Sequence, residues 1–414
     1  MNNTPRSYWL ASSQLPTFPK LDKDIEVDVA IVGAGIAGIT SAYLLVNAGL
    51  KVAVIEASRI LNGTTGHTTA KITAQHGLIY DEFINHFGKS KARLYYEAST
   101  DALHFIRHTV EDLNISCDFH IDDAYIFATT EEGVRKLEKE ASAYRTLKID
   151  GTLVDTIPFQ ELNVKKALVM KKQAQFHPLH YLKALVSIIA EKGGQLYEQT
   201  TAVNVETGPL PTVLTRDGKR VKCTHVLACS HFPFYEGLGF YFTRLKAERS
   251  YVLCVKATKP YRGGMYINAE SPTRSLRSVR IDGSDYVLVG GESHKTGQGE
   301  EMMNHYKALE QFAKQLYGDD VEIAYRWSAQ DLTTLDKLPY IGQLTTGNPN
   351  ILIATGFRKW GMTNGTIAAL LLADKVLGKN NRYEKLFSPS RFFIDPSLKN
   401  FFAENVDVAK HLLK

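Results

Sequence analysis

The chain has 414 residues, of which 44% are hydrophobic and 22% charged, and its formal net charge at pH 7 is +5. This length predicts roughly two to three domains' worth of core in an ordinary globular protein. The charge is spread along the chain without a Lys/Arg block, so it favours neither nucleic acid nor a membrane surface as a partner. Residues 1–20 contain no apolar run, which predicts neither a signal peptide nor a membrane span and favours the cytoplasm.

A strand, a glycine-rich turn and a helix stand near the start of the chain. The apolar run Val27–Val32 leads into Gly33-Ala34-Gly35-Ile36-Ala37-Gly38, an Ala/Leu-rich helix follows, and a second apolar run ends at Glu56. The glycines allow a tight turn and the close approach of a pyrophosphate, which the helix N-terminus attracts. Glu56 is placed to accept hydrogen bonds from a ribose. The pattern therefore predicts a dinucleotide-binding unit.

The middle of the chain alternates between helical and strand patterns. It predicts, in order, a polar loop at Ser58–Thr69, a helical region at Tyr80–Leu113, a strand at Cys117–Thr129, a helix at Glu131–Lys148, a helix at Tyr181–Lys192 and a strand at Gln195–Val205. We interpret the last two elements as part of a second βαβ-like passage. Short strands around the Asp217-Gly218 turn follow.

Residues 231–324 are rich in strand patterns, and a strand, a glycine segment and a helix at Asn364–Leu377 come after them. We predict an α/β protein in which a Rossmann-like dinucleotide-binding domain with a central parallel sheet (residues 25–110, 160–230 and 330–414) carries an inserted antiparallel-sheet substrate domain (111–159 and 231–329). The widely spaced cysteines Cys117, Cys223, Cys229 and Cys254 form no metal pattern and predict core thiols.

Three motifs occur in the order seen in one family: the opening glycine turn, Gln175–Leu179 before a helix, and Leu338–Gly342 followed by Ala354-Thr355-Gly356 and Gly361. The chain resembles FAD-dependent amine and amino-acid oxidoreductases of the D-amino-acid oxidase superfamily, which includes glycine oxidase, sarcosine oxidase, γ-glutamylputrescine oxidase and dimethylglycine dehydrogenase. The resemblance covers nearly the whole chain and implies FAD as the cofactor.

The resemblance also implies which residues hold FAD. The contacts would come from Gly33, Ala34, Gly35, Ile36, Ala37, Gly38, Glu56, Ala57, Ser58, Thr64, Thr65, His67, Thr68, Thr69, Val203, Ala228, Gly356, Lys359, Gly361, Met362 and Thr363. Among these, Val203 would lie on the strand whose backbone meets adenine. Gly356 and Gly361–Thr363 would face the isoalloxazine ring, near amides that stabilise negative charge.

The loop Gly63–Thr69 looks like the segment of the dimethylglycine and sarcosine dehydrogenases whose histidine is bonded covalently to the flavin. His67 falls on that histidine, but Gly66 replaces the family's tryptophan. Two interpretations therefore stay open: a covalent histidyl flavin, or a hydrogen-bonded or exposed loop histidine.

The substrate-binding residues are predicted from charge. Asp331 stands near the position at which glycine-oxidase-like relatives carry a carboxylate-binding arginine, so it would attract an ammonium, or else cap a turn or pair with Arg326. Lys359 would bind an anionic group or activate oxygen, or point to solvent. Tyr251 would face the flavin and Arg277 would anchor a carboxylate, unless both serve ordinary sheet packing.

We therefore predict an FAD-dependent oxidoreductase that takes hydride from a C–N bond of an amine or amino acid. The electrons would pass to oxygen or another carrier. A flavin module working with a Rieske iron–sulfur domain is a second interpretation, because some bacterial relatives carry such a domain. A flavin-binding protein without turnover is a third.

Overall fold

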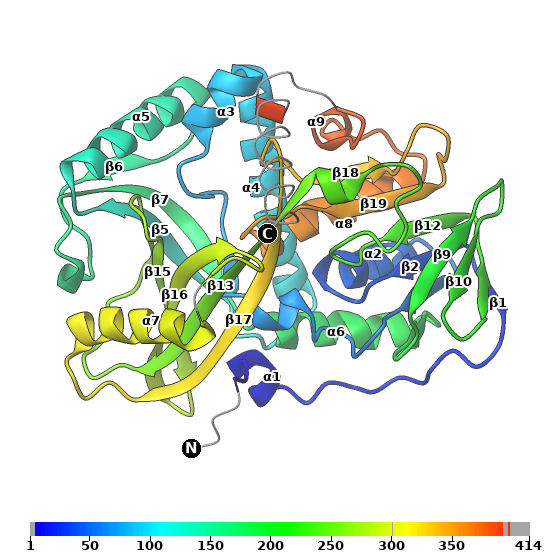
Figure 1. The fold of residues 1–414 in the computed structure, drawn as a ribbon, viewed down its shortest axis with the longest axis horizontal. Helices are drawn as coiled ribbons and strands as arrows, with labels where there is room; N and C mark the ends of the chain where they lie inside the picture. The colour runs from blue at the N-terminus through cyan, green and yellow to red at the C-terminus, as the bar shows by residue number, and fades with distance from the viewer. Residues whose placement is uncertain (1–4, 300, 392–395, 398–414) are drawn as a thin grey trace.

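The computed structural model describes residues 5–299, 301–391 and 396–397. Its strands form three sheets, of six, four and nine strands. In Figure 1 the sheet that carries β2 and β12 lies on one side of the molecule with helices α2 and α6, and the largest sheet lies on the other side with α5 and α7.

The six-stranded sheet has the order β18-β19-β12-β2-β3-β8. All its neighbouring pairs are parallel except β18 with β19. The strands are β2 (Val29–Val32), β3 (Val52–Ile55), β8 (Gln195–Tyr197), β12 (His225–Ala228), β18 (Tyr340–Gln343) and β19 (Ile351–Thr355). β2, β3 and β19 are buried along their whole length, as expected for parallel strands covered on both faces.

Different layers cover the two faces of this sheet. Val29 and Ile31 of β2 pack in one core with α2 (Ile36–Asn47), α6 (Pro178–Glu191) and α8 (Gly361–Val376). Ala30 and Val32 point the other way and pack with the four-stranded sheet, which has the order β1-β11-β10-β9. Its strands are β1 (Ile25–Glu26), β9 (Ala202–Glu206), β10 (Thr212–Thr215) and β11 (Arg220–Lys222).

The nine-stranded sheet runs β17-β13-β16-β15-β14-β5-β7-β4, with β6 paired to β7. Only β14 and β5 pair in parallel. The strands are β4 (Lys71–Ile72), β5 (His120–Ala128), β6 (Thr152–Val154), β7 (Lys166–Gln175), β13 (Leu245–Lys256), β14 (Met265–Asn268), β15 (Arg274–Ile281), β16 (Ser284–Lys295) and β17 (Ile323–Thr334). Helix α7 (Met302–Tyr317) packs against one face through Leu309 and Ala313.

The remaining helices are α1 (Tyr8–Ser12), α3 (Tyr80–Phe87), α4 (Lys89–Asp112), α5 (Glu131–Leu147) and α9 (Glu384–Phe387). Buried Glu140 of α5 accepts the amides of Ile79, Tyr80 and Asp81 at the start of α3, within 2.8–3.0 Å. No helix in the described part of the chain is long and apolar enough to cross a membrane.

The fold class is the predicted one, but several predicted elements are wrong. The single helical region Tyr80–Leu113 is two helices, because Gly88 takes a φ of +81° between them. The predicted strand Gln195–Val205 is β8 and β9, which lie in different sheets. Helix α7 lies inside the region predicted to be rich in strands, where no helix was predicted.

The predicted domain boundaries also differ from the sheets. β7 precedes α6 but belongs to the nine-stranded sheet, so the passage through α6 to β8 is no βαβ unit. The segment 160–230, predicted for the FAD domain, therefore contributes a long strand to the other domain. Beyond residue 391, the predicted FAD-domain segment lies outside the described residues except at 396–397.

Candidate functional site

The glycine turn after β2 needs glycine at two positions for steric reasons. Gly33 has a φ of +103°, and a Cβ there would lie 2.5 Å from the carbonyl oxygen of Cys229. A Cβ on Gly38 would lie 1.9 Å from the carbonyl oxygen of Gly33. Both close approaches let α2 begin directly above the strand, with its N-terminal amides open to an anion.

Glu56 ties this turn to the end of β3. Its carboxylate accepts the Ala34 amide at 3.0 Å and the Ser58 amide at 2.9 Å. Thr65 adds a second tie, because its Oγ1 accepts the Ile36 amide at 3.1 Å. The acid is thus fixed beside the turn, as binding of a ribose requires.

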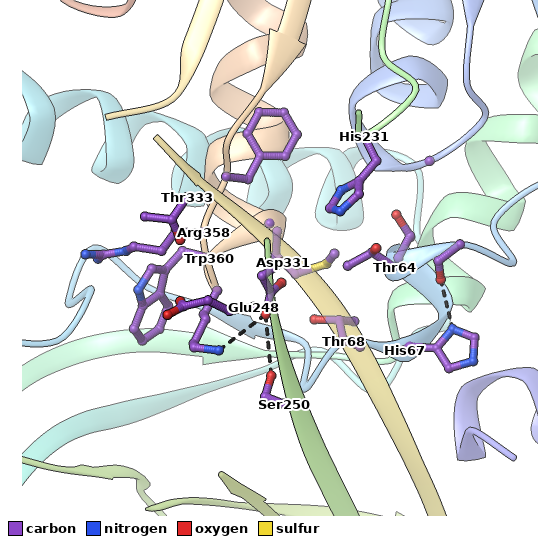
Figure 2. A pocket seen from close by; sticks show the side chains of 18 of the residues that line it. Thr64, His67, Thr68, His231, Glu248, Ser250, Asp331, Thr333, Arg358 and Trp360 are labelled. Carbon is purple, nitrogen blue, oxygen red and sulfur yellow. Dashed lines mark hydrogen bonds and ion pairs between the residues drawn. The ribbon is translucent and has the colours of Figure 1, made fainter. Parts of the chain in front are cut away.

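A cavity of about 1060 Å³ extends from the glycine turn to Trp360–Met362 and to the face of the nine-stranded sheet. Its volume lies at the upper end of the range for small-molecule and cofactor sites. Of the residues predicted to contact FAD, those that line the cavity are Gly33, Ala34, Gly35, Ile36, Ala37, Glu56, Ala57, Thr64, Thr65, His67, Thr68, Thr69, Lys359, Gly361 and Met362. Figure 2 shows part of this cavity, with Thr64 and His67 on one side and Trp360 and Arg358 on the other.

The other predicted FAD residues do not line the cavity. Gly38 and Ser58 belong to the packing of the turn, and Ala228 is buried inside β12. Val203 points to solvent on β9 and is 44% exposed, whereas its neighbours Thr201 and Ala202 line the cavity. The predicted contact with adenine is made by the backbone of this strand, so it stays a prediction.

Two residues of the C-terminal glycine segment also serve the fold. Gly356 has a φ of +77°, and a Cβ there would lie 2.4 Å from Thr334 Cγ2. Thr363 donates its hydroxyl to the Thr73 carbonyl at 3.0 Å. Both lie beside the start of α8, where Gly361 and Met362 line the cavity.

These residues fit the FAD that the sequence predicts. A side chain at Gly33 or Gly38 would collide with backbone, so the turn has the close-approach geometry of a pyrophosphate cradle. α2 and α8 both begin at the cavity, where helix N-termini stabilise negative charge. The individual FAD contacts remain predictions.

The loop Gly63–Thr69 forms a short 3-10 turn at Thr64–His67. His67 Nδ1 lies 2.9 Å from the Gly63 carbonyl, and Figure 2 marks this bond. A backbone carbonyl can only accept, so Nδ1 is the donor of this bond.

Asp331 lies on β17 and faces the cavity, so it caps no turn. Its Oδ2 is 3.5 Å from Lys359 Nζ and 3.4 Å from Ser250 Oγ, and it makes no ion pair with Arg326. Burial raises the pKa of this carboxyl, and the nearby ammonium opposes the shift. Glu248 pairs with Asp331 in register on β13 and brings a second carboxylate to the same wall (Figure 2).

Tyr251 borders the cavity, but its ring packs on the opposite face of the sheet, which is the sheet-packing alternative that the sequence left open. Alternation along β13 turns it toward α7, where it packs with Tyr306 and stacks on His305 at a centroid distance of 4.7 Å. Its hydroxyl lies within hydrogen-bond distance of His294 Nε2, at 3.0 Å, and His294 Nδ1 lies 2.9 Å from the carbonyls of Lys295 and Gln298. Ser250, one residue earlier, is the cavity-facing side chain.

Arg277 is not placed to anchor a substrate carboxylate. The side chain is 2% exposed and lies outside the cavity lining. Its Nη1 donates to the carbonyls of Thr69 and Ala70 at 3.0 and 2.9 Å, and its Nε donates to Ser278. Five donors on one planar group suit this bridging of backbone carbonyls. We assign Arg277 to holding the loop in place.

Sequence reasoning missed several cavity residues. His76 stacks on Trp360 at a centroid distance of 4.8 Å, and its Nδ1 lies 2.6 Å from the Tyr95 hydroxyl. Burial lowers the pKa of His76 well below its ordinary value, so this imidazole is neutral. Lys71, on β4, also lines the cavity. No periodic or motif signal marks either residue, because their neighbours come from distant segments.

Within the described residues no group of His, Cys, Asp and Glu is arranged to hold a metal ion. The four cysteines are buried and form no disulfide. Burial raises the pKa of Cys117, Cys223 and Cys229 to about 12.

A parallel-sheet dinucleotide cradle that shares one cavity with a large antiparallel sheet defines an FAD-binding oxidoreductase architecture. The chain belongs to the DAO family of FAD dependent oxidoreductases, whose sequence profile matches residues 28–375. This membership confirms the resemblance seen in the sequence, and it implies FAD and a small-molecule substrate.

Three similar proteins illustrate the range of the family. The chain is 48% identical to YhfW of Bacillus subtilis (strain 168), provisionally named a Rieske 2Fe-2S iron-sulfur protein, over 99% of this chain and 80% of that protein. It is 25% identical to the gamma-glutamylputrescine oxidoreductase of Escherichia coli (strain K12), over 93% and 92% of the two chains. The crystal structure of glycine oxidase from Geobacillus kaustophilus superposes with a TM-score of 0.74 at 20% identity, over 89% of this chain and 99% of that one.

Proposed function

We propose that this protein oxidises a C–N bond of an amine or amino acid. FAD, when bound, supplies the hydride acceptor. The carbon next to nitrogen would lose a hydride and the nitrogen a proton, leaving an imine that water hydrolyses to a carbonyl compound and an amine. The electrons would then leave to oxygen or another carrier.

The observation that carries this proposal is the acidic wall of the cavity. Asp331 and Glu248 lie on adjacent strands, and Asp331 is 8% exposed. A carboxylate in this setting attracts a substrate ammonium more strongly than it would in water. Lys359, 3.5 Å from Asp331, would hold the acid in place until the substrate arrives.

The named relatives support the same chemistry. Gamma-glutamylputrescine oxidoreductase and glycine oxidase are, by name, enzymes of amino compounds, and both match most of this chain. Asp331 in place of a carboxylate-binding arginine favours a substrate whose ammonium is recognised on this wall.

Anaerobic reduction of the bound flavin tests the proposal. The holoprotein would be mixed with a panel of primary and secondary amines and of amino acids, and loss of the 450-nm band followed. Bleaching by at least one member is expected, with slower bleaching in Asp331→Asn. Failure of every compound to bleach the flavin would favour a flavin-binding protein without turnover.

A second candidate function is electron delivery to a Rieske iron–sulfur domain. The 48% identity to YhfW favours it, because that protein carries a Rieske name and about a fifth of its length lies outside the match. Flavin bleached by an amine would then be reoxidised slowly by oxygen and rapidly by an added Rieske protein.

Covalent attachment of FAD through His67 stays a prediction. Nδ1 is engaged with the Gly63 carbonyl, so a link would use Nε2. Precipitation of the holoprotein in acid tests it: flavin that stays with the polypeptide supports the link, and fully released flavin contradicts it.

A further inference from the structure

The lysines that line the cavity differ in their charge partners. Within the described residues, three are ion-paired: Lys246 with Glu248 at 3.5 Å, Lys337 with Glu82 at 2.7 Å and Lys359 with Asp331 at 3.5 Å. Lys71 has no carboxylate within 4 Å in the same part of the chain, and its Nζ donates only to the Tyr266 carbonyl at 3.3 Å. Lys71 is therefore the cavity lysine that lacks a counter-charge.

The surroundings of Lys71 disfavour an ammonium that has no carboxylate partner. Lys71 is partly exposed toward the cavity, and burial together with the Arg277 guanidinium on β15 lowers its pKa to about 7. Burial raises the pKa of the phenols beside it, Tyr266 on β14 and Tyr125 on β5. The nearby carboxylate of Asp122 accepts Gln175 Nε2 at 3.0 Å and the Gly264 amide at 2.7 Å. A buried ammonium that no carboxylate contacts either loses its proton or is stabilised by an anionic ligand.

A hollow beside Lys71 offers room for that ligand. Ile267, Ser275 and Gly290 lie opposite one another on β14, β15 and β16, and all three line the cavity. A Cβ on Gly290 would lie 2.9 Å from Ser275 Oγ, so the glycine keeps space open next to this hydroxyl. The Tyr266 carbonyl that holds Lys71 Nζ is one residue along β14 from this row.

We propose that Lys71 and the Ser275 hydroxyl form a subsite that binds the carboxylate of the substrate. The proposal rests on the proposed function and narrows it to amino acids and amines that carry a carboxylate. Such a substrate carries both charges: its ammonium would bind at the acidic wall of Asp331 and Glu248, and its carboxylate would bind in the hollow beside Lys71. The structure thus provides on β4 the cation that sequence reasoning expected at Arg277.

Binding of unreactive carboxylates to the holoprotein tests the subsite without turnover. Acetate, propionate and benzoate would be titrated against the visible flavin spectrum, with acetamide, propionamide and benzamide as neutral analogues. We expect the carboxylates to bind at least tenfold tighter than the amides. Lys71→Met is expected to raise the carboxylate Kd about tenfold, and Ser275→Ala about threefold. Lys71→Arg, which keeps the charge, should retain most of the affinity.

Lys337→Met is the matched control, because Lys337 lines the same cavity but is already ion-paired. Its carboxylate Kd should stay within twofold of the parent. Equal binding of carboxylates and amides, or an unchanged carboxylate Kd in Lys71→Met, would overturn the proposal. If Lys71→Met does not fold, Lys71→Gln and Ser275→Ala give the same comparison.

The outcomes also separate the subsite from the proposed function. Selective carboxylate binding that depends on Lys71, without bleaching by any amino compound, would uphold the subsite and reject C–N oxidation. Bleaching by amines and amino acids with equal efficiency in the parent and in Lys71→Met would uphold C–N oxidation and reject the subsite.

Discussion

Replacing Arg277 by methionine tests whether this residue holds the loop Gly63–Thr69 in place or binds substrate. Methionine keeps the length and apolar packing of the side chain but removes every donor. The Thr69 and Ala70 carbonyls, now bonded at 3.0 and 2.9 Å, would lose this partner in a place where Ala70 is fully buried.

The size of the effect follows from those two bonds. A buried carbonyl that loses its partner costs about 1–3 kcal/mol, so two cost about 2–6 kcal/mol. Removing a buried charge gives back part of this cost. We therefore expect Arg277→Met to lower the free energy of unfolding by about 2–3 kcal/mol, and to weaken FAD binding because the same loop lines the cavity.

Urea denaturation of the apoprotein, and of the protein in saturating FAD, measures both effects. The matched control is Arg280→Met on the same strand, since Arg280 is exposed and its contacts to the Gly283 carbonyl are 3.4 Å long. It should change stability by less than about 0.5 kcal/mol. Our reasoning fails if Arg277→Met behaves like Arg280→Met, or if it weakens only carboxylate binding while stability and FAD affinity stay unchanged.

Three further changes probe the cofactor turn and the carboxylate subsite. Gly38→Ala should weaken FAD binding by more than about tenfold, because a Cβ there would lie 1.9 Å from the Gly33 carbonyl oxygen. Gly63→Ala is the control, since a Cβ on Gly63 would have no protein atom within 4 Å. Fluorescence titration with FAD should give this variant the Kd of the parent. Glu56→Gln should raise the FAD Kd about tenfold, since the Glu56 carboxylate accepts two backbone amides and remains available to a ribose. An unchanged Kd would show that Glu56 does not contribute to FAD binding. Burial and the Arg277 guanidinium lower the pKa of Lys71 to about 7. Carboxylate affinity should therefore be highest between about pH 5, above which the ligand is ionised, and about pH 7, and it should fall up to about tenfold per pH unit above that. Lys71→Arg should show no such fall above about pH 7, and its absence in the parent would contradict the assignment.

The sequence predicts best those parts of the fold that local rules determine. The glycine turn, the acid at Glu56 and the helix after Gly361 follow from spacing and steric demands within a few dozen residues. The break at Gly88 and the separation of β8 from β9 were missed, because a short apolar pattern does not reveal which sheet a strand joins.

Side-chain direction accounts for the errors at the site. Tyr251 borders the cavity, but its ring points to the face of the sheet that α7 covers, and Val203 points to solvent. Ser250 and Ala202, one residue earlier on each strand, also line the cavity. Lys71 was missed because nothing in its own segment shows that three other cavity lysines are ion-paired across distant strands.

The carbonyl oxygens of residues 67–70 show why such a site needs the whole chain. Trp327 Nε1 donates to the His67 carbonyl at 2.8 Å, and Trp9 Nε1 donates to the Thr68 carbonyl at 2.7 Å. Arg277 Nη1 donates to the carbonyls of the next two residues, Thr69 and Ala70. None of these donors lines the cavity. The carbonyls are therefore drawn to the outer side of the loop, which leaves the Thr68 and Thr69 side chains to line the cavity. The donors are 59 to 260 residues away along the chain, so helix α1 and strands β15 and β17 determine the shape of a loop that carries the family resemblance.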